Sequence, residues 1–390
     1  MARKLNSVVG IDIGSRSIKV AELKSQGKEV VVTALGMAAT PEGAVDHTGI
    51  YNGDAVAGAL KQALQQAGSS VAQAVVSIAG QASVLVRTLE VPRMSPTELK
   101  EHMQWEINRN IPFSESTVVS DFKVLTDEDP NSANMDVVMA ICPQSAIDGL
   151  MSCVKKAGRQ LAAIDVEPMG LARSIDASYG EDWKDQTVCL IDIGHKTTSI
   201  NIYKNGKLLM PRQVPIGGEM FTKAIADKTG VPMSEAEDTK QATDLNGLQP
   251  VGSAGTQQFQ PYNPFSEEAE APPEGADPGV TAAITPAAGG GGAASAMEDV
   301  LNEFVSEIRR SIDYYKSRGA SVDRLSVCGG GAQQKGLSSF LASATGMACD
   351  LFDPMKRIQI SAKKNSQELL DHHRQEFAVA VGNGLYVFYD

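Results

Sequence analysis

Cysteine and histidine are scarce in this chain of 390 residues, and neither is arranged for metal binding. There are five of each, no two cysteines form a Cys-x-x-Cys pair, and the one histidine cluster, His372-His373, lacks the spacing of zinc ligands. These absences argue against a zinc site and against a disulfide framework. We therefore expect the cysteines to be small buried side chains in a protein of a reducing compartment.

Long apolar runs and an excess of positive charge are also missing. No stretch approaches the ~18 consecutive apolar residues of a transmembrane helix, and the apolar run after the basic N-terminus is interrupted by Asp12. We therefore expect neither a membrane span nor a signal peptide. The formal net charge is −12, which argues against unaided nucleic-acid binding. The length suits about two or three core-forming units.

Two signatures of catalysis are absent as well. The chain has no Gly-x-x-x-x-Gly-Lys-Ser/Thr motif, which excludes the P-loop form of nucleotide binding. It also has no recognisable arrangement of Ser, His and Asp, or of Cys and His, so we do not expect covalent catalysis by these residues.

The chain does contain one sequence motif that occurs twice. An apolar run that ends in Asp-Ile-Gly opens each half of the chain, at residues 9–14 and 189–194, and a second apolar run follows after a short polar segment. This pattern predicts strand, tight turn, strand in both halves. Two such hairpins facing each other would place backbone N–H groups on both sides of an anion. Asp12 and Asp192 would lie beside it and hold a hydrated Mg²⁺.

The two turns supply the groups that bind phosphate. Hydroxyl and N–H groups would surround the phosphate oxygens, and Arg16 and Lys196 would add positive charge, although both would equally suit a solvated loop. The candidate nucleotide-binding residues of the hairpins are Asp12, Gly14, Ser15, Arg16, Ser17, Lys19, Asp192, Gly194, His195, Lys196 and Thr197.

Further candidates lie outside the hairpins. Gly329, Gly330 and Gly331 follow a predicted strand, and glycine lets the backbone approach a flat ring closely, so we assign them to an adenosine site. Glu237 and Lys240, one helical turn apart, would reach the ribose and the base, or would form an ordinary exposed ion pair. Glu167 follows a strand end and would orient a water toward the γ-phosphate. The alternative for Glu167 is a carboxylate stabilised by the first turn of a helix.

Within the first half, residues 84–160 read as a β-α-β-β-α insert. Its first helix begins with a complete capping box at 95–98. The apolar side chains of this helix and of the turn after it are Met103, Trp105, Ile107, Ile111 and Phe113. We expect them to pack against the sheet of the insert, with the alternative that some of them line a groove for a partner.

Residues 245–296 differ in kind from the rest of the chain. They are rich in proline, include four consecutive glycines at 289–292 and show no apolar periodicity. This composition predicts a flexible linker. On both sides of the linker the second half repeats the element order of the first, β-β-β-α-β.

These elements in this order resemble the actin-like ATPase superfamily. The phrases at 10–19, 105–113 and 164–168 are most similar to the FtsA/PilM family, and within it to the PilM proteins of type IV pilus assembly. The resemblance covers nearly the whole chain outside the linker. It implies an α/β, actin-like ATPase fold with two related β-β-β-α-β-α domains and an insert at the position of subdomain 1C of FtsA.

The resemblance also implies a division into subdomains. The expected parts are 1A (1–83, 161–186 and the C-terminal helix in 356–390), 1C (84–160), 2A (187–218 and 319–355) and 2B with its linker (219–318).

In function, the resemblance implies a cytoplasmic adaptor that binds ATP and Mg²⁺, with at most slow ATPase activity. It would capture the cytoplasmic N-terminal tail of PilN in a groove between 1A and 1C. It would thereby lie at the inner membrane and link PilN to the pilus motor ATPases and platform protein for pilus extension, retraction and twitching motility. The resemblance also admits a ring-like homo-oligomer.

Two other classes of protein are alternatives to the adaptor. An FtsA-like polymerising ATPase of cell division would carry a membrane-targeting helix after its last fold helix, whereas this chain stops at Tyr389-Asp390. We therefore expect the adaptor. A small-molecule kinase of the same superfamily would need a base beside an acceptor hydroxyl, and the sequence offers no clear candidate.

Overall fold

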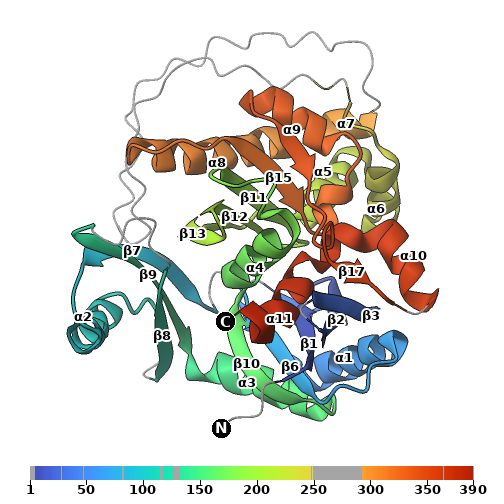
Figure 1. The fold of residues 1–390 in the computed structure, drawn as a ribbon. Helices are drawn as coiled ribbons and strands as arrows, with labels where there is room; N and C mark the ends of the chain where they lie inside the picture. The colour runs from blue at the N-terminus through green and yellow to red at the C-terminus, as the bar shows by residue number, and fades with distance from the viewer. Residues whose placement is uncertain are drawn as a thin grey trace.

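Two α/β domains face each other in the structure, which is a computed structural model (Figure 1). It describes residues 5–27, 29–46, 48–80, 83–114, 117–125, 132–246, 248, 292–362 and 364–389. The first domain contains β1 to β3 and α1, and the second contains β11, β12 and the long helix α8 (Figure 1). The chain passes to the second domain through α4 (Glu167–Tyr179) and returns to the first between β16 (Cys349–Leu351) and β17 (Gln359–Ile360).

The first domain is built on a sheet of strand order β10-β6-β1-β2-β3-β17. Its strands are β1 (Ser7–Ile13), β2 (Ser17–Gln26), β3 (Glu29–Ala39), β6 (Gln73–Ile78), β10 (Gln160–Val166) and β17 (Gln359–Ile360). β1, β2 and β3 are antiparallel, as their hairpin-length connections predict, and β6 and β10 run parallel to β1. Val9 and Ile11 of β1 pack toward α1 (Gly53–Ala67), and Gly10 between them faces α11 (Ala378–Tyr389).

The second domain repeats this plan, with strand order β16-β15-β11-β12-β13. Its strands are β11 (Thr187–Ile193), β12 (Thr198–Lys204), β13 (Lys207–Met210), β14 (Gln213–Val214), β15 (Arg324–Cys328) and β16 (Cys349–Leu351). Its helices are α5 (Gly218–Thr229), α6 (Met233–Ala242), α7 (Gly292–Ala296), α8 (Glu298–Ser317) and α9 (Leu337–Thr345). β13 and β14 are separated at Pro211, which has no N–H to donate to a sheet.

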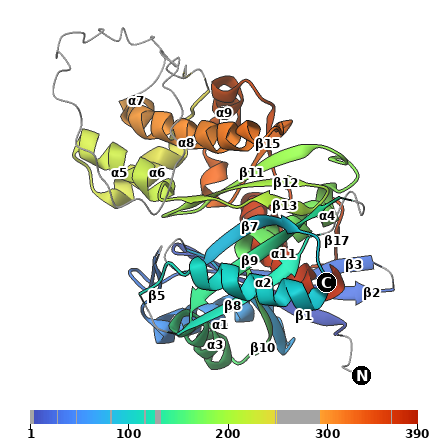
Figure 2. The ribbon, with the colours of Figure 1, turned by 90° about the vertical axis from the view of Figure 1, so that its left-hand side faces the viewer.

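The insert forms a small antiparallel sheet of order β7-β9-β8, with β7 (Leu85–Pro92), β8 (Val118–Val124) and β9 (Asn134–Pro143). α2 (Pro96–Arg109) covers one face, and α3 (Gln144–Lys156) returns the chain to the first domain (Figure 2). Met103 and Ile107 are buried against this sheet as predicted. The same prediction is wrong for Trp105 and Ile111, which are 56% and 37% exposed, because they lie on the outer side of α2 and in the turn after it.

The insert also touches the second domain. Thr88 of β7 donates a hydrogen bond to the carbonyl of Leu209 on β13 (2.8 Å), and Lys207 pairs with Asp136 of β9. Val138 of β9 lies in one hydrophobic cluster with residues of β12 and β13. The insert therefore bridges the two domains rather than extending freely from the first.

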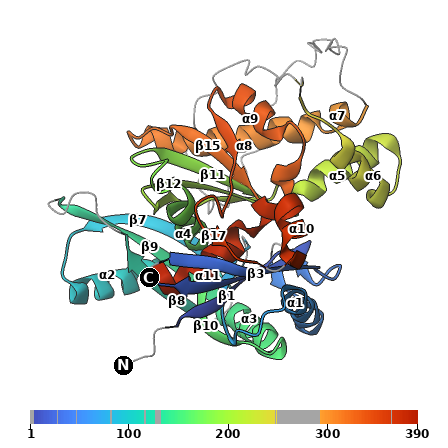
Figure 3. The ribbon, with the colours of Figure 1, turned by 45° about the vertical axis from the view of Figure 1, so that its right-hand side comes forward.

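α4 (Glu167–Tyr179) and α11 cross between the domains at glycines. A Cβ atom at Gly382 of α11 would lie 1.9 Å from the carbonyl oxygen of Gly170 on α4, so only glycine permits this approach. The predicted C-terminal helix, α11, begins only at Ala378, because residues 374–377 form a 3₁₀ turn. The segment before that turn forms α10 (Lys364–His373), which packs beside β3 (Figure 3).

The predicted linker 245–296 is wrong at both ends. Leu245, Ala294 and Ala296 are buried in the core of the second domain, and residues 292–296 form α7. These pieces are too short to show a periodicity, so composition alone misassigns them. The remainder, residues 247 and 249–291, lies outside the described residues. In the part of the chain that the structure describes, each helix is too short or too polar to cross a membrane.

Candidate functional site

The two Asp-Ile-Gly hairpins have the same backbone geometry. The N–H of Gly14 donates to the carbonyl of Ser17 (3.1 Å), and the N–H of Gly194 donates to the carbonyl of Thr197 (3.0 Å). Neither turn has room for a side chain at its glycine, because a Cβ would lie 2.9 Å and 2.7 Å from those same carbonyl oxygens. The repeated sequence therefore folds into a repeated turn.

Neighbouring elements fix the carbonyl groups of both turns. Thr40, at the end of β3, donates through Oγ1 to the carbonyl of Gly14 (2.6 Å) and through N–H to that of Arg16 (2.9 Å). The start of α5 does the same in the second domain, where the N–H of Gly218 donates to the carbonyl of Gly194 (2.9 Å). With the carbonyls engaged, N–H and side-chain groups of the turns are available for an anion.

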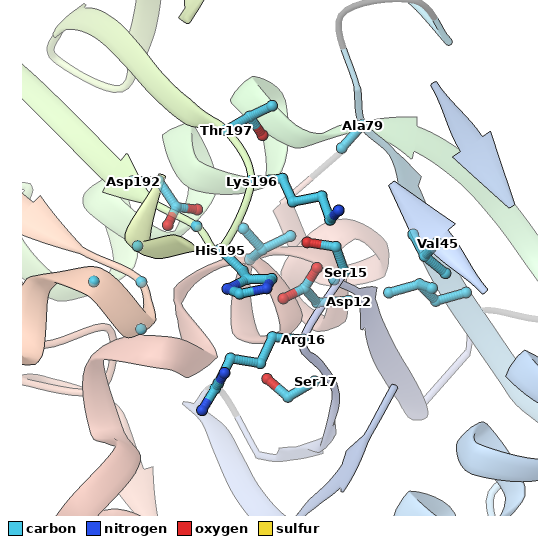
Figure 4. Close-up of a pocket in the computed structure, with 18 of the residues that line it drawn as sticks. Asp12, Ser15, Arg16, Ser17, Val45, Ala79, Asp192, His195, Lys196 and Thr197 are labelled. Atoms are coloured by element: carbon cyan, nitrogen blue, oxygen red, sulfur yellow. The ribbon is translucent and has the colours of Figure 1, made fainter. Parts of the chain in front are cut away.

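A cavity of about 890 Å³ separates the hairpins. Figure 4 shows Asp12 and Ser15 of the first hairpin facing His195 and Lys196 of the second. Every candidate residue from the sequence lines this cavity: Asp12, Gly14, Ser15, Arg16, Ser17, Lys19, Glu167, Asp192, Gly194, His195, Lys196, Thr197, Glu237, Lys240, Gly329, Gly330 and Gly331. The sequence thus predicted which residues meet, although its assignment of their roles is not tested by this placement.

One buried lysine lies among the acidic groups of the cavity. Lys19 pairs with Asp12 (Nζ–Oδ2 3.2 Å), and both side chains are largely buried. Burial opposes the charge of Lys19, but the neighbouring carboxylates of Asp12, Glu376 and Asp192 outweigh it and raise the pKa of Lys19. Lys19 is therefore a fixed positive charge beside the first hairpin.

The pKa values of two other carboxyl groups are raised, to about 8 for Glu167 and about 7 for Asp192. Burial, and next the charge of Asp192, raise the pKa of Glu167, whose carboxylate accepts a hydrogen bond from Ser199 (2.5 Å). Burial and the charge of Asp12 raise the pKa of Asp192 in the same way. Glu167 is both the first residue of α4 and part of the cavity wall, so the two alternatives from the sequence are compatible.

The described residues contain no cluster of three side chains that would ligate a metal directly. Mg²⁺ prefers oxygen ligands and keeps several of its waters. Asp12 and Asp192, on opposite hairpins, fit such an ion as carboxylates that contact its water shell.

The far end of the cavity suits a nucleoside. Glu237 pairs with Lys240 (2.8 Å) and accepts a hydrogen bond from Thr222 (2.5 Å), and both charged side chains are about 14% exposed or less. The alternative of an ordinary exposed pair is therefore wrong. Burial opposes ionisation of Glu237, but these hydrogen bonds lower its pKa to about 2. The apolar wall beside this pair consists of Phe221, Leu245, Met297, Leu301 and Leu337.

Arg16 and Lys196 are not simply solvated. Arg16, about half exposed, reaches Glu237 across the cavity (3.3 Å), and Lys196 lies 3.5 Å from Glu219 at the start of α5. His195 is near the same Glu219 carboxylate (3.6 Å). Burial is the main reason that the pKa of His195 lies below its ordinary value.

Packing against the second hairpin also requires glycine in the glycine-rich loop. A Cβ at Gly329, whose φ is +81°, would lie 2.2 Å from Oδ1 of Asp192, and one at Gly331 would lie 2.3 Å from Ile193. The loop must therefore lie directly against the second hairpin, whether or not a ring approaches it.

Comparison with known proteins identifies the family. The model of the family described as type IV pilus assembly protein PilM matches residues 10–249. This chain belongs to the PilM family. The model of cell division protein FtsA matches residues 189–382.

Solved structures and curated relatives agree with this. A PilM–PilN type IV pilus biogenesis complex superposes with a TM-score of 0.78 at 23% identity, covering both chains completely. The ethanolamine utilization protein EutJ of Carboxydothermus hydrogenoformans superposes at 0.54, with 15% identity over 98% of this chain and 92% of EutJ. FtsA of Pseudomonas aeruginosa is 26% identical over 258 residues, and that of Neisseria meningitidis 25% over 255 residues. The PilM-family chain spans about 60% of the length of these FtsA proteins. Its fold is the actin-like ATPase fold.

The cavity of this PilM-family protein has a second arm, in the region where the family resemblance implied a groove between 1A and 1C, but its lining residues were not predicted from the sequence. It runs between the first domain and the insert, where β4 (Val45–Asp46) and β5 (Gly49–Ile50) face α3. Its walls are small or apolar and include Ala79, Gly80, Ala146, Gly149 and Leu150. The signal for it, glycine and alanine on one side of a helix, is too common to be informative.

Sequence analysis also missed cavity residues of the C-terminal segment. Glu376 and His373 line the cavity, as do Gln333 and Gln334 after the glycine-rich loop. The only sequence signal of Glu376 and His373 is their place near the start of the C-terminal helix. That of Gln333 and Gln334 is their place directly after the glycine-rich loop.

Proposed function

We propose that this PilM-family protein is an ATP-binding adaptor of the type IV pilus assembly platform that binds the cytoplasmic N-terminal tail of a PilN-type protein. The observation that carries this proposal is the single cavity with two arms. One arm runs between the two phosphate hairpins, and the other runs between the first domain and the insert.

The first arm has one set of groups for each part of Mg-ATP. The hairpin turns and Lys19 would hold the phosphates, Asp12 and Asp192 the water shell of Mg²⁺, and Glu237 the ribose hydroxyls. The apolar wall near Leu337 and the loop at 329–331 would enclose the base. The subdomain boundaries predicted for 1A, 1C, 2A and 2B are part of this proposal.

We propose that hydrolysis is slow or absent. Glu167 is the one group in the cavity to which we assign the orientation of a water. Because burial keeps it protonated near neutral pH, it is a poor base until a cation or a conformational change favours its charged form.

The second arm is the proposed site of the PilN tail. The solved PilM–PilN complex, which superposes along the whole chain, supports a partner of this kind. An extended peptide suits a narrow groove with small side chains on its walls. Through PilN, the protein would lie at the cytoplasmic side of the inner membrane and link it to the pilus motor ATPases and platform protein during extension, retraction and twitching motility.

Calorimetric titration with a synthetic N-terminal tail of the cognate PilN-type protein tests the proposal, with and without Mg-ATP. We expect saturable binding of the peptide and of Mg-ATP. A matched pair of variants locates the peptide. Gly149→Arg fills the second arm, and Gly58→Arg places the same side chain on the exposed face of α1; a Cβ at either glycine meets nothing within 4 Å.

Gly149→Arg should weaken peptide binding by about tenfold or more, because the arginine occupies the groove, and Gly58→Arg should leave it unchanged. Equal peptide affinity in both variants would place the tail elsewhere. Absence of Mg-ATP binding by the unmodified protein would refute the assignment of the first arm.

The match to the FtsA model at residues 189–382 favours a second candidate, a polymerising ATPase. Sedimentation of the protein with Mg-ATP separates the two. Filaments that pellet without any PilN tail would favour polymerisation, whereas a tail-binding protein that stays in the supernatant would favour the adaptor.

A further inference from the structure

Glu376 joins three segments that are far apart in the sequence. Its carboxylate accepts hydrogen bonds from Ser17 of the first hairpin (3.5 Å) and from Gln333 after the glycine-rich loop (3.0 Å). His373, one turn earlier in its own segment, contributes Nδ1 at 2.8 Å. The Glu376 side chain is only 12% exposed and lies in the cavity wall. The repeated motifs give this carboxylate no role.

Glu376 carries its negative charge at neutral pH. Burial opposes ionisation, but the hydrogen bond from His373 and the charge of Lys19 outweigh it and hold the pKa of Glu376 below its ordinary value. An anion of the protein therefore already lies against the hydroxyl and near the ammonium group that we assign to the phosphates.

Phosphate and Glu376 need the same partners. The Ser17 hydroxyl has one proton, and while it donates to Glu376 it offers a phosphate oxygen only lone pairs. Lys19 would be shared between two anions, which repel each other. A nucleotide that enters the cavity must therefore displace Glu376 from Ser17 or overcome its charge.

His373 lies where it would reduce the repulsion between Glu376 and the phosphates. When it is protonated it neutralises Glu376 and donates to Oε1, the carboxylate oxygen other than the one that accepts from Ser17. The hydrogen bond to Glu376 raises the pKa of His373 against the effect of burial. The other charged groups that face this pair are Lys19 of β2, Glu368 of α10 and Asp192 of β11.

We propose that Glu376 is an internal competitor of the nucleotide phosphates for Ser17 and Lys19, and that His373 is the positioning residue that weakens this competition. The inference rests on the proposed binding of ATP in the cavity. It predicts that the affinity for ATP rises when the charge at position 376 is removed, although the hydrogen bonds of a buried carboxylate are weakened.

Calorimetric titration of the full chain with Mg-ATP tests this at about pH 6 and about pH 8.5, on either side of the ordinary histidine range. Glu376→Gln should bind ATP about fivefold more tightly than the unmodified protein at the higher pH. The gain should shrink at the lower pH, where His373 is protonated. The charge of Glu376 also raises the pKa of Asp192, so a variant of His373 is needed to assign the change with pH to the pair.

Two further variants complete the design. His373→Gln should weaken ATP binding at the lower pH, and the double variant with Glu376→Gln should behave as Glu376→Gln alone. Glu303→Gln, on the exposed face of α8, removes the same charge from a residue that does not line the cavity, and controls for the net charge of the protein. It should leave the affinity unchanged.

The outcomes are distinct. Glu376→Gln that binds ATP equally or more weakly at both pH values would overturn the inference while leaving the proposed function intact. Weak binding that Glu376→Asp restores would show that the carboxylate supports the nucleotide. An unmodified protein that does not bind Mg-ATP would overturn the proposed function itself.

Discussion

Replacing Gly382 by alanine tests whether the crossing of α4 and α11 fixes the relation between the two domains. The added Cβ would lie 1.9 Å from the carbonyl oxygen and 2.4 Å from the carbonyl carbon of Gly170, and ordinary contact begins near 3.4 Å. The two helices would have to separate by about 1.5 Å. Because both atoms belong to a backbone, no side chain can rotate away.

The expected change in the free energy of unfolding follows from two opposing effects. Alanine favours a helix interior over glycine by about 1 kcal/mol, and overpacking of a close contact costs about 1–3 kcal/mol, more when backbone must move. We expect a net loss of about 2 kcal/mol, which lowers the thermal midpoint of a domain of this size by about 4–8 °C. Since the crossing lies between the domains, Mg-ATP binding should weaken as well.

Thermal unfolding followed by circular dichroism measures the loss of stability, and calorimetry measures the weaker binding of Mg-ATP. Gly58→Ala is the matched control, because a Cβ on that exposed helical glycine meets nothing within 4 Å. It should raise the midpoint slightly. If Gly382→Ala were as stable as Gly58→Ala, the helices would not be held at the distance described, and the reasoning would be refuted.

Three other predictions concern the cavity. Asp12→Ala and Asp192→Ala should each weaken Mg-ATP binding by about tenfold or more, and calorimetry that finds unchanged affinity in both would refute the magnesium assignment. Thr40→Val removes the hydroxyl that holds the Gly14 carbonyl and should weaken ATP binding severalfold; Thr40→Ser, which keeps the hydroxyl, should restore it. For Glu167 the folded-state pKa of about 8 exceeds the ordinary value, so folding takes up a proton and stability declines as pH rises from about 4.5 to about 8. Glu167→Gln should therefore raise the thermal midpoint at pH ~8.5 and have little effect at pH ~4.5, and an equal effect at both would contradict the buried, protonated carboxyl.

Local sequence patterns predicted the parts of the site that depend on one hairpin or one turn. Asp-Ile-Gly at the end of an apolar run is sufficient to fix both a strand end and its turn, and the match between 9–14 and 189–194 implied that the two turns face each other. The capping box at Ser95 and Glu98 likewise predicted the start of α2, and both of its hydrogen bonds are present.

What the sequence did not reveal depends on tertiary packing. The place of Glu376 is set by α10 and by the crossing of α11 over β1, which bring residue 376 to Ser17. The bridge from Thr88 to Leu209 joins segments with no pattern in common. Trp105 has the apolar character of a core residue, and only the packing of α2 determines that it is exposed.

The two hairpins are similar in backbone but differ in charge, and the register of the strands explains the difference. In the first hairpin the residue opposite Asp12 is Lys19, so the carboxylate is neutralised by an ion pair. In the second hairpin the residue opposite Asp192 is Ser199, whose hydroxyl is engaged by Glu167. Among the described residues neither Asp192 nor Glu167 forms an ion pair of its own. The charge of Lys19 lowers the pKa of both carboxyl groups, but burial outweighs it and raises them.

A hydrated magnesium ion would therefore gain more binding free energy on the side of the second hairpin. There it would replace protons that are held only because burial disfavours the charge, whereas at Asp12 it would compete with an existing ion pair. Binding of Mg-ATP should accordingly release protons near neutral pH, and calorimetry in two buffers of different ionisation enthalpy would count them. Asp192→Asn should abolish most of this release while Lys19→Met should not, and the reverse result would place the ion at the first hairpin.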